Sequence, residues 1–84
     1  MDLSKLQNLL EEQMQWPADY HFKFVVKTEQ KHEVLHHLSD HKNTEKLSKN
    51  GNYTSITATK LYHKSDDIIA VYKNVSKVEG IITL

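Results

Sequence analysis

The sequence predicts an α+β domain in which one helix precedes the element order β-α-β-β-α-β. Three observations predict it. Apolar residues recur at three- and four-residue spacing in three segments, they alternate with polar residues in the segments between, and one Asn-Gly pair separates two of those strand-like segments. The 84 residues suffice for a single domain, which we expect to comprise a helical extension over residues 1–16 and a core over residues 19–84.

The first segment, residues 2–15, is expected to form a helix. Asp2 or Ser4 could cap its beginning, and the helix should end at Trp16-Pro17, since the residue before proline avoids the helical conformation. Apolar residues share one face: Leu3, Leu6, Leu10 and Met14. This stripe must be covered, either by the rest of the domain or by a second copy or another partner.

Residues 20–28 predict a strand, because strongly β-forming residues alternate there with polar ones. Phe22, Phe24 and Val26 fall on one face. The other face receives His21, Lys23, Val25 and Lys27. Residues 29–41 then predict a second helix whose apolar stripe is formed by Val34, Leu35 and Leu38.

A β-hairpin is expected next, with a polar edge strand over 43–49 and a second strand over 52–62. Asn50-Gly51 between them favours a type I′ turn, which requires positive φ at both central residues. Such a turn places Ser48 opposite Tyr53 and Leu47 opposite Thr54. The inner face would then hold Leu47, Ile56 and Ala58, and the outer face Lys46, Ser48, Tyr53, Ser55, Thr57 and Thr59.

The last elements are a third helix beginning at Ser65 and a strand over 78–84. Ser65 is expected to cap the helix, and Asp66 and Asp67 place acid at its positive end. Its buried stripe should contain Ile68, Val71, Tyr72 and Val75. Right-handed crossovers would then give a four-stranded antiparallel sheet in the order fourth, first, third, second, with two helices on one face. This arrangement is the ferredoxin-like sandwich.

Composition excludes several kinds of function. Eleven basic and eleven acidic residues give zero net charge, so no global field would attract nucleic acid or an anionic membrane. All the basic residues are lysine, which removes the arginine fork for phosphate. The absence of cysteine excludes disulfides, thiolate metal sites and a cysteine nucleophile. No signal peptide or membrane-spanning apolar run is visible, so we expect a cytoplasmic protein.

Three stretches resemble a known family. They are Trp16-Pro17 followed by Tyr20 and Phe22-Lys23-Phe24, the hairpin segment 48–55, and the C-terminal runs 68–72 and 75–84. Together they resemble the YbeD-like bacterial family of unknown function, domain of unknown function 493. The connection from the first strand through Glu29 into the second helix is shorter than the corresponding connection in that family. The resemblance implies a ferredoxin-like fold similar to ACT-type regulatory domains, which bind small molecules and often pair. It implies no activity and no catalytic residues.

The hairpin is the best candidate for a ligand- or partner-binding site. Its loop offers amides and side-chain dipoles at Asn50, Gly51 and Asn52, and the outer face beside it carries Lys23, Ser48, Tyr53 and Ser55. The structural alternative is that Gly51 only makes the turn and Tyr53 only packs across the strands. We expect a non-enzymatic module that binds a small molecule or regulates, without a cofactor. The alternative is a protein-interaction module that uses the outer sheet face or the N-terminal helix, as a homodimer or with another protein.

Four histidines lie in or near the second helix. His32 and His36 are four residues apart, as are His37 and His41, and residues 32–36 satisfy the letters H-E-x-x-H. Helical geometry places the pairs on different flanks, and a zinc protease needs a third ligand and a longer chain. We therefore expect no metal site, and at most adventitious zinc or nickel binding on a solvated face.

Other functions of similar folds are also disfavoured. Acylphosphatases hold phosphate with an arginine, and metal chaperones of this fold use a CxxC pair; the chain has neither. RNA-recognition domains need several stacking aromatic residues on the outer face, where this sequence places only Tyr53. No paired carboxylates or Ser/His/Asp set can be placed together, so no enzymatic activity is expected.

Overall fold

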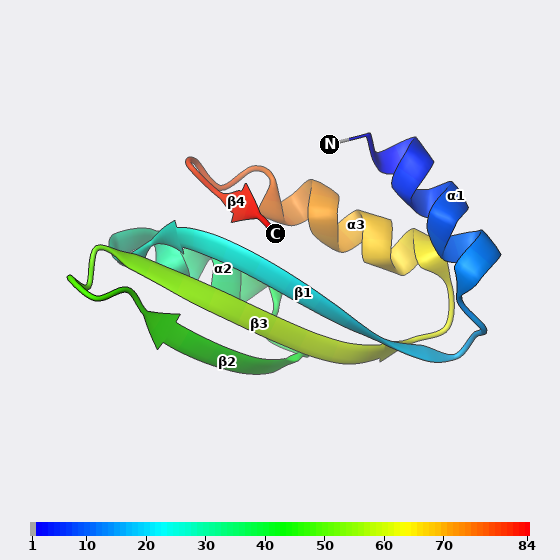
Figure 1. The fold of residues 1–84 in the computed structure, drawn as a ribbon, viewed down its shortest axis with the longest axis horizontal. Coiled ribbons are helices and arrows are strands. Elements are labelled where there is room, and N and C mark those ends of the chain that lie inside the picture. Colours follow the sequence, from blue (N-terminus) through cyan, green and yellow to red (C-terminus); the bar gives the residue numbers. More distant parts are fainter. Residues whose placement is uncertain (1) are drawn as a thin grey trace.

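The computed structural model describes residues 2–84 and shows an α+β protein with three α-helices and one four-stranded antiparallel sheet (Figure 1). The expected domain starts at residue 1, which lies outside the described residues. The elements in chain order are α1 (Leu3–Gln13), β1 (Ala18–Lys27), the 3-10 turn η1 (Thr28–Gln30), α2 (Lys31–His37), β2 (Lys42–Leu47), β3 (Tyr53–Tyr62), α3 (Ser65–Val75) and β4 (Ile82–Thr83).

The sheet has the order β2-β3-β1-β4. Counted from the β4 edge, this is fourth, first, third, second, the order set out from the sequence. The ten-residue strands β1 and β3 form its centre and pair along their full length, from Ala18 opposite Tyr62 to Lys27 opposite Tyr53. β2 lies at one edge, as predicted for the polar strand, and β4 at the other.

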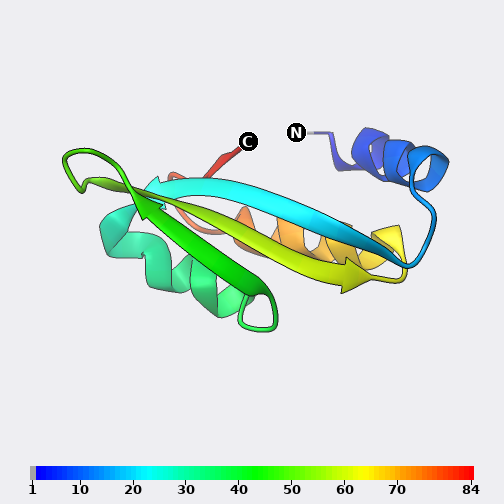
Figure 2. The same ribbon diagram turned by 60° about the horizontal axis from the view of Figure 1, so that its bottom comes forward.

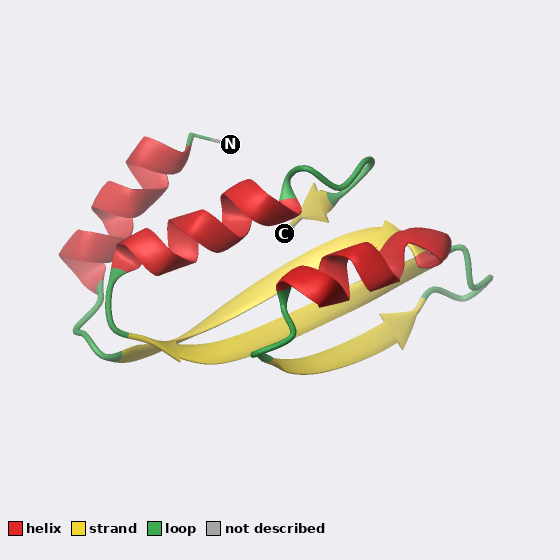
Figure 3. Ribbon diagram, turned by 180° about the vertical axis from the view of Figure 1, so that it is seen from behind, coloured by secondary structure: helices red, strands yellow, loops and turns green. Residues whose placement is uncertain are grey.

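The core lies between the sheet and helices α2 and α3, which both cover its inner face (Figure 3). The predicted alternation along β1 is confirmed, because Phe22, Phe24 and Val26 are fully buried. Fully buried apolar partners come from β3 and the helical segments: Ile56, Ala58, Val34, Leu38 and Ile68. Burying each such large side chain contributes roughly 1.5–3 kcal/mol, so this layer is the main source of stability.

Helix α1 packs against α3 and leaves the outer face of the sheet uncovered (Figures 1 and 3). The Asp2 carboxylate caps it by accepting a 3.2 Å hydrogen bond from the Lys5 amide, so Asp2, not Ser4, is the cap. The helix ends at Gln13, two residues before the predicted end. Leu10 is buried, and Leu6 packs against the core. The apolar stripe is therefore covered mainly within the chain.

Ser65 does not cap α3, contrary to the sequence prediction. Lys64 is the cap residue and makes no side-chain cap bond. The Ser65 side chain is instead fully buried, donates to the Glu11 carboxylate and accepts a 3.2 Å bond from Gln7 Nε2. The serine thus joins α3 to α1. Ile69, which was left out of the predicted stripe, is also buried in the core.

The second helix and the last strand are also shorter than predicted. The second helix was expected over 29–41, but η1 replaces its beginning and α2 ends at His37. The last strand was expected over 78–84, but Val78 is buried in the turn after α3 and Gly80 adopts φ of 74°. Pairing therefore begins only at Ile82. None of the helices in residues 2–84 is long and apolar enough to cross a bilayer.

Leu47 has the predicted neighbour but not the predicted burial. It lies opposite Thr54, as the sequence indicated, yet 59% of its surface is exposed. Ile56 and Ala58, the other inner-face residues of the hairpin, are fully buried. The difference arises because Leu47 ends the edge strand, outside the cluster of buried side chains.

Candidate functional site

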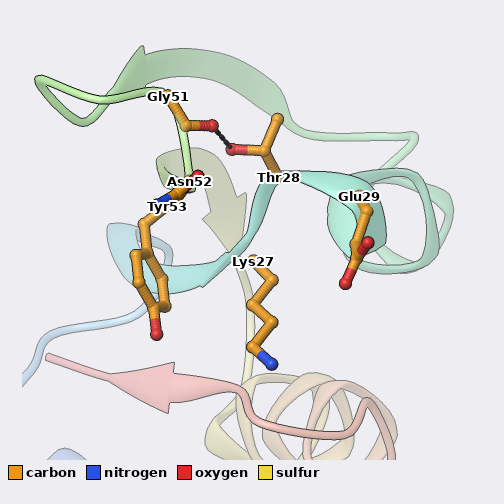
Figure 4. A pocket seen from close by; sticks show the side chains of 6 residues that line it. All are labelled: Lys27, Thr28, Glu29, Gly51, Asn52 and Tyr53. Carbon is orange, nitrogen blue, oxygen red and sulfur yellow. Dashed lines mark hydrogen bonds between the residues drawn. The ribbon is translucent and has the colours of Figure 1, made fainter.

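An open pocket lies where the β2–β3 hairpin meets the corner between β1 and α2 (Figure 4). Its volume is about 390 Å³. The lining residues come from two chain segments: Lys27, Thr28 and Glu29 from the corner, and Gly51, Asn52 and Tyr53 from the hairpin. Figure 4 shows the side chains of Lys27, Glu29 and Tyr53 extending to the same side. This hairpin pocket therefore presents a cation, an anion and a phenol together.

The hairpin loop is not the predicted type I′ turn. Among residues 2–84 only the two glycines have positive φ, so Gly51 adopts 77° while Asn50 does not. Gly51 N donates to Ser48 O at 2.9 Å, and Ser48 N donates to Tyr53 O at 2.8 Å. Residues 49–52 thus form a four-residue loop closed by the Ser48–Tyr53 pair. The predicted pairing of Ser48 with Tyr53 is correct, because a four-residue loop preserves the register of a two-residue turn.

Side chains inside the loop satisfy its backbone. Asn50 Oδ1 accepts a 3.1 Å bond from the Asn52 amide and another 3.1 Å bond from the Ser48 hydroxyl. Ser48 Oγ in turn accepts a 3.0 Å bond from the Tyr53 amide. Ser48 and Asn50 therefore shape the loop, as serine and asparagine commonly do at turns.

Thr28 holds the hairpin against the corner. Its hydroxyl donates to Gly51 O at 2.7 Å and lies 2.9 Å from Thr54 Oγ1, and its amide donates to Asn52 O at 3.0 Å. These bonds join segments more than twenty residues apart in the chain. The Thr28 side chain and backbone thus hold the two segments of the pocket together.

The structure brings together part of the predicted site. Gly51, Asn52 and Tyr53 line the pocket. Lys23 and Ser55 lie on the outer face as predicted but outside the pocket lining, since Lys23 is opposite Thr57 and Ser55 is opposite Val25.

Sequence reasoning missed Lys27, Thr28 and Glu29 as site residues. The pairing of β1 with β3 places Lys27 opposite Tyr53 and carries Thr28 to Asn52. No local signal gives that register. Tyr53 keeps 42% of its surface exposed. The alternative in which Tyr53 only packs across the strands does not require this exposure.

The four histidines of the α2 region have different environments. His32 and His36 are exposed, and His37 is partly buried. The predicted placement of His41 on a solvated helix face is wrong, because α2 ends at His37 and His41 is buried. Within residues 2–84, no group of three or more histidine or carboxylate side chains is positioned to hold a metal ion.

His41 belongs to a second polar group, the Tyr62 cluster, formed by Asp40, His41, Lys60 and Tyr62. His41 Nε2 lies 2.5 Å from the Tyr62 hydroxyl. His41 Nδ1 lies 2.9 Å from an Asp40 carboxylate oxygen. Lys60 Nζ donates to the other Asp40 oxygen at 2.5 Å. The cluster joins the start of β2 to the end of β3.

Burial decides the charge states in the Tyr62 cluster. Burial lowers the pKa of His41 from its ordinary value of 6.5, and the nearby Asp40 carboxylate only partly opposes this. Burial also raises the pKa of Tyr62 well above its usual range. The hydrogen bond from Lys60 lowers the pKa of Asp40. At neutral pH the buried His41–Tyr62 pair is therefore uncharged, and the charged groups lie toward solvent.

The outer face of the sheet faces the viewer in Figure 1, with α2 behind it. The register places Lys23 and Lys27 of β1 and Lys42 and Lys46 of β2 on this face, around a centre of serine and threonine. Asp19 is the one carboxylate that β1–β4 contribute to it. Ile82 and Leu84, each about half exposed or more, add apolar surface near Val25.

The chain was compared with known families and proteins. The family model described as "Protein of unknown function (DUF493)" matches residues 11–84. The chain belongs to the DUF493 family. The resemblance stated from the sequence is thereby confirmed, and the matched range of this DUF493 member includes the whole sheet, both core helices and the hairpin pocket. The searches of curated proteins and of solved structures gave no match.

Proposed function

We propose that this DUF493 member is a non-enzymatic regulatory module with a ferredoxin-like, ACT-like fold that binds a small polar molecule in the hairpin pocket. The observation that carries the proposal is the composition of the pocket, which Lys27, Glu29 and Tyr53 line beside the bond from the Thr28 hydroxyl to Gly51 O. Among residues 2–84 neither Lys27 nor Glu29 forms an ion pair. Both charges are therefore free to meet a ligand.

The pocket chemistry favours a zwitterion of amino-acid size. The Lys27 ammonium suits a carboxylate, and the Glu29 carboxylate suits an ammonium group, because charge-assisted hydrogen bonds are the strongest polar contacts available to a small ligand. The half-exposed ring of Tyr53 offers apolar surface for a side chain. A volume of about 390 Å³ lies at the lower end of ordinary ligand pockets.

The placement of the titratable groups supports a non-enzymatic role. The buried histidine and its tyrosine lie at the opposite end of β3 from the pocket. His41 is engaged by Tyr62 and is remote from Lys27 and Glu29, which lie at the other end of the sheet. The pocket itself contains groups that bind and orient, without an adjacent base and nucleophile pair.

A screen of amino acids against the full chain tests this proposal. Saturable chemical-shift changes should appear at Asn52 and Tyr53, together with a rise in melting temperature. Lys27→Ala and Glu29→Ala should each weaken binding by about tenfold or more, a loss typical of one charged contact. Lys42→Ala, on the outer face at the far end of β2, is the matched control and should bind normally. Silence across the screen at millimolar ligand would reject the proposal.

A second function, a protein-interaction module, is favoured by the uncovered outer face. Its four lysines and the apolar surface of Ile82 and Leu84 would suit an acidic protein segment with a few apolar side chains. Titration with a glutamate-rich peptide should shift the amides of Lys23 and Thr57, and the double charge reversal Lys23→Glu with Lys46→Glu should abolish the effect. An effect that persists in this variant would count against the second function.

A further inference from the structure

The two edges of the sheet differ in how completely they are closed. β4 pairs with only two residues of β1, Phe24 opposite Thr83 and Val25 opposite Ile82. One more bond follows, in which Leu84 N donates to Lys23 O at 2.9 Å. The remaining half of β1, residues 18–22, has β3 on one side and no strand on the other. Figure 2 shows this half of β1 at the rim of the sheet, between the C terminus and α1.

The hydrogen-bond pattern shows which backbone groups face the open edge. Thr28 N bonds to Asn52 O within the β1–β3 register, and bonded pairs alternate along an antiparallel ladder, so even-numbered residues of β1 bond to β3. The bond from Leu84 to Lys23 shows that odd-numbered residues face the other way. Asp19 and His21 therefore direct their N–H and C=O groups to the open edge, where no group in residues 2–84 bonds to them.

The side chains of the same two residues are complementary. Asp19 and His21 are exposed and share the outer face, because Phe22 and Phe24 point inward. Suppose that a second copy adds its β1 antiparallel, with Tyr20 opposite Tyr20. Asp19 then lies opposite His21 of the second copy at both ends, and all the open groups are paired. The next possible register in one direction would set Asp19 opposite Asp19, and the next in the other direction would set His21 opposite His21. Like groups directly opposite each other destabilise a strand pair, so both registers are disfavoured.

The other edge is less suited to self-pairing. The bond from Ser48 N to Tyr53 O shows that the even-numbered residues of β2 bond to β3. The backbone N–H and C=O groups of Asn43, Glu45 and Leu47 therefore point away from β3, toward the open side of the strand. Charged residues occupy half of this strand: Lys42, Glu45 and Lys46. Charge along an edge strand is a common protection against edge-to-edge association.

We propose that the Asp19–His21 segment of β1 is a self-association edge, where a second copy of this chain pairs antiparallel and joins the two four-stranded sheets into one. The contact is isologous, as expected for a twofold dimer. Only short segments pair, so the dimer should form reversibly and depend on concentration. This interface is separate from the hairpin pocket and does not depend on the proposed ligand.

Sedimentation equilibrium of the full chain from about 0.05 mM to about 1 mM should show a monomer–dimer equilibrium. Asp19→Pro removes an N–H that faces the open edge without breaking the β1–β3 ladder, so it should weaken association by about tenfold or more while the fold is retained. Glu45→Pro makes the same change at the β2 edge and is the matched control, which should dimerise normally. Circular dichroism checks the fold of both.

Two measurements keep the test decisive if a proline variant fails to fold. The amides of Asp19 and His21 should exchange freely in dilute wild-type protein and become protected as concentration rises. H21D should weaken association by opposing two carboxylates, and adding D19H should restore it. A protein that stays monomeric at about 1 mM with both amides unprotected overturns the proposal. A dimer lost in Glu45→Pro and kept in Asp19→Pro would also overturn it.

Discussion

Strand β3 begins with Tyr53 and ends with Tyr62, and the two tyrosines have opposite environments. Tyr53 keeps 42% of its surface exposed at the rim of the hairpin pocket, whereas Tyr62 keeps 3% and contacts buried His41. Residue type and strand are the same, so position relative to the core makes the difference. Tyr62 continues the inner-face series of Thr54, Ile56 and Ala58, while Tyr53 starts on the outer face.

The comparison separates groups that hold the fold from groups that are free to bind. At the Tyr62 end, polar side chains are buried and must satisfy one another, because an unpaired buried polar group is costly. At the Tyr53 end, the loop satisfies itself through Ser48, Asn50 and Thr28, which leaves Lys27 and Glu29 unpaired in the described structure. We therefore expect stability effects at one end and binding effects at the other.

The largest expected effect is on Tyr62. Tyr62→Ala should lower the free energy of unfolding by about 3–5 kcal/mol, because it opens a cavity in the core and leaves His41 without its partner. Tyr53→Ala, at the exposed end of the same strand, should change it by less than about 1 kcal/mol. Urea denaturation of both variants measures the difference. Equal losses would show that the two ends are not distinct.

The Tyr62 end should also respond to pH. The pKa of His41 is lowered in the folded state. Between that lowered pKa and pH 6.5, the unfolded state therefore binds more protons than the folded state. The stability that neutral His41 contributes is thus present above pH 6.5 and is lost as pH falls toward its folded pKa. The pKa of Asp40 is also lowered, so its contribution persists until pH falls below 3.8 and does not affect this window.

His41→Leu tests this pH dependence. At pH 7 the variant should lose about 1–3 kcal/mol, since the Tyr62 hydroxyl is left unpaired. The difference from wild type should shrink as pH is lowered from about 7 to about 5. His36→Gln, at an exposed position, is the control and should follow the wild-type pH profile. A constant difference across this range would mean that His41 does not titrate on unfolding.

Gly51 gives a smaller effect at the hairpin end. Its φ is 77°, and a Cβ added there would meet nothing within 4 Å, so the cost of substitution comes from the backbone alone. Gly51→Ala should lower the free energy of unfolding by about 1–2 kcal/mol. Gly51→Asn should cost less, because asparagine adopts this conformation more readily. Equal costs for the two variants would show that the positive φ does not set the cost.

Local pattern predicted the elements better than it predicted their ends. The alternation of Phe22, Phe24 and Val26 identified β1 and its buried face, because the period of a strand is a local property. The end of α2 was misplaced because Leu38 and His41 turn into the core, which is a tertiary contact. A tertiary contact also explains why Ser65 was wrongly predicted to be a helix cap. Its actual partners, Gln7 and Glu11, are more than fifty residues away.

Half of the candidate site could be predicted from the sequence. Asn50-Gly51 marked the hairpin from sequence, because turn chemistry is local. The other half of the pocket depends on Thr28 meeting Gly51, a contact set by how β1 aligns with β3. Sequence alone gave no measure of that register, because both strands alternate evenly and several alignments would bury the same residue types.

Lys27 should contribute least to stability. Lys27 is exposed, lies outside the core and forms no ion pair within residues 2–84, so Lys27→Ala should change the free energy of unfolding by no more than about 0.5 kcal/mol. Urea denaturation beside wild type and Gly51→Ala measures this. A loss as large as that of Gly51→Ala would make Lys27 part of the scaffold, and its effect on ligand binding would then no longer identify the pocket as the binding site.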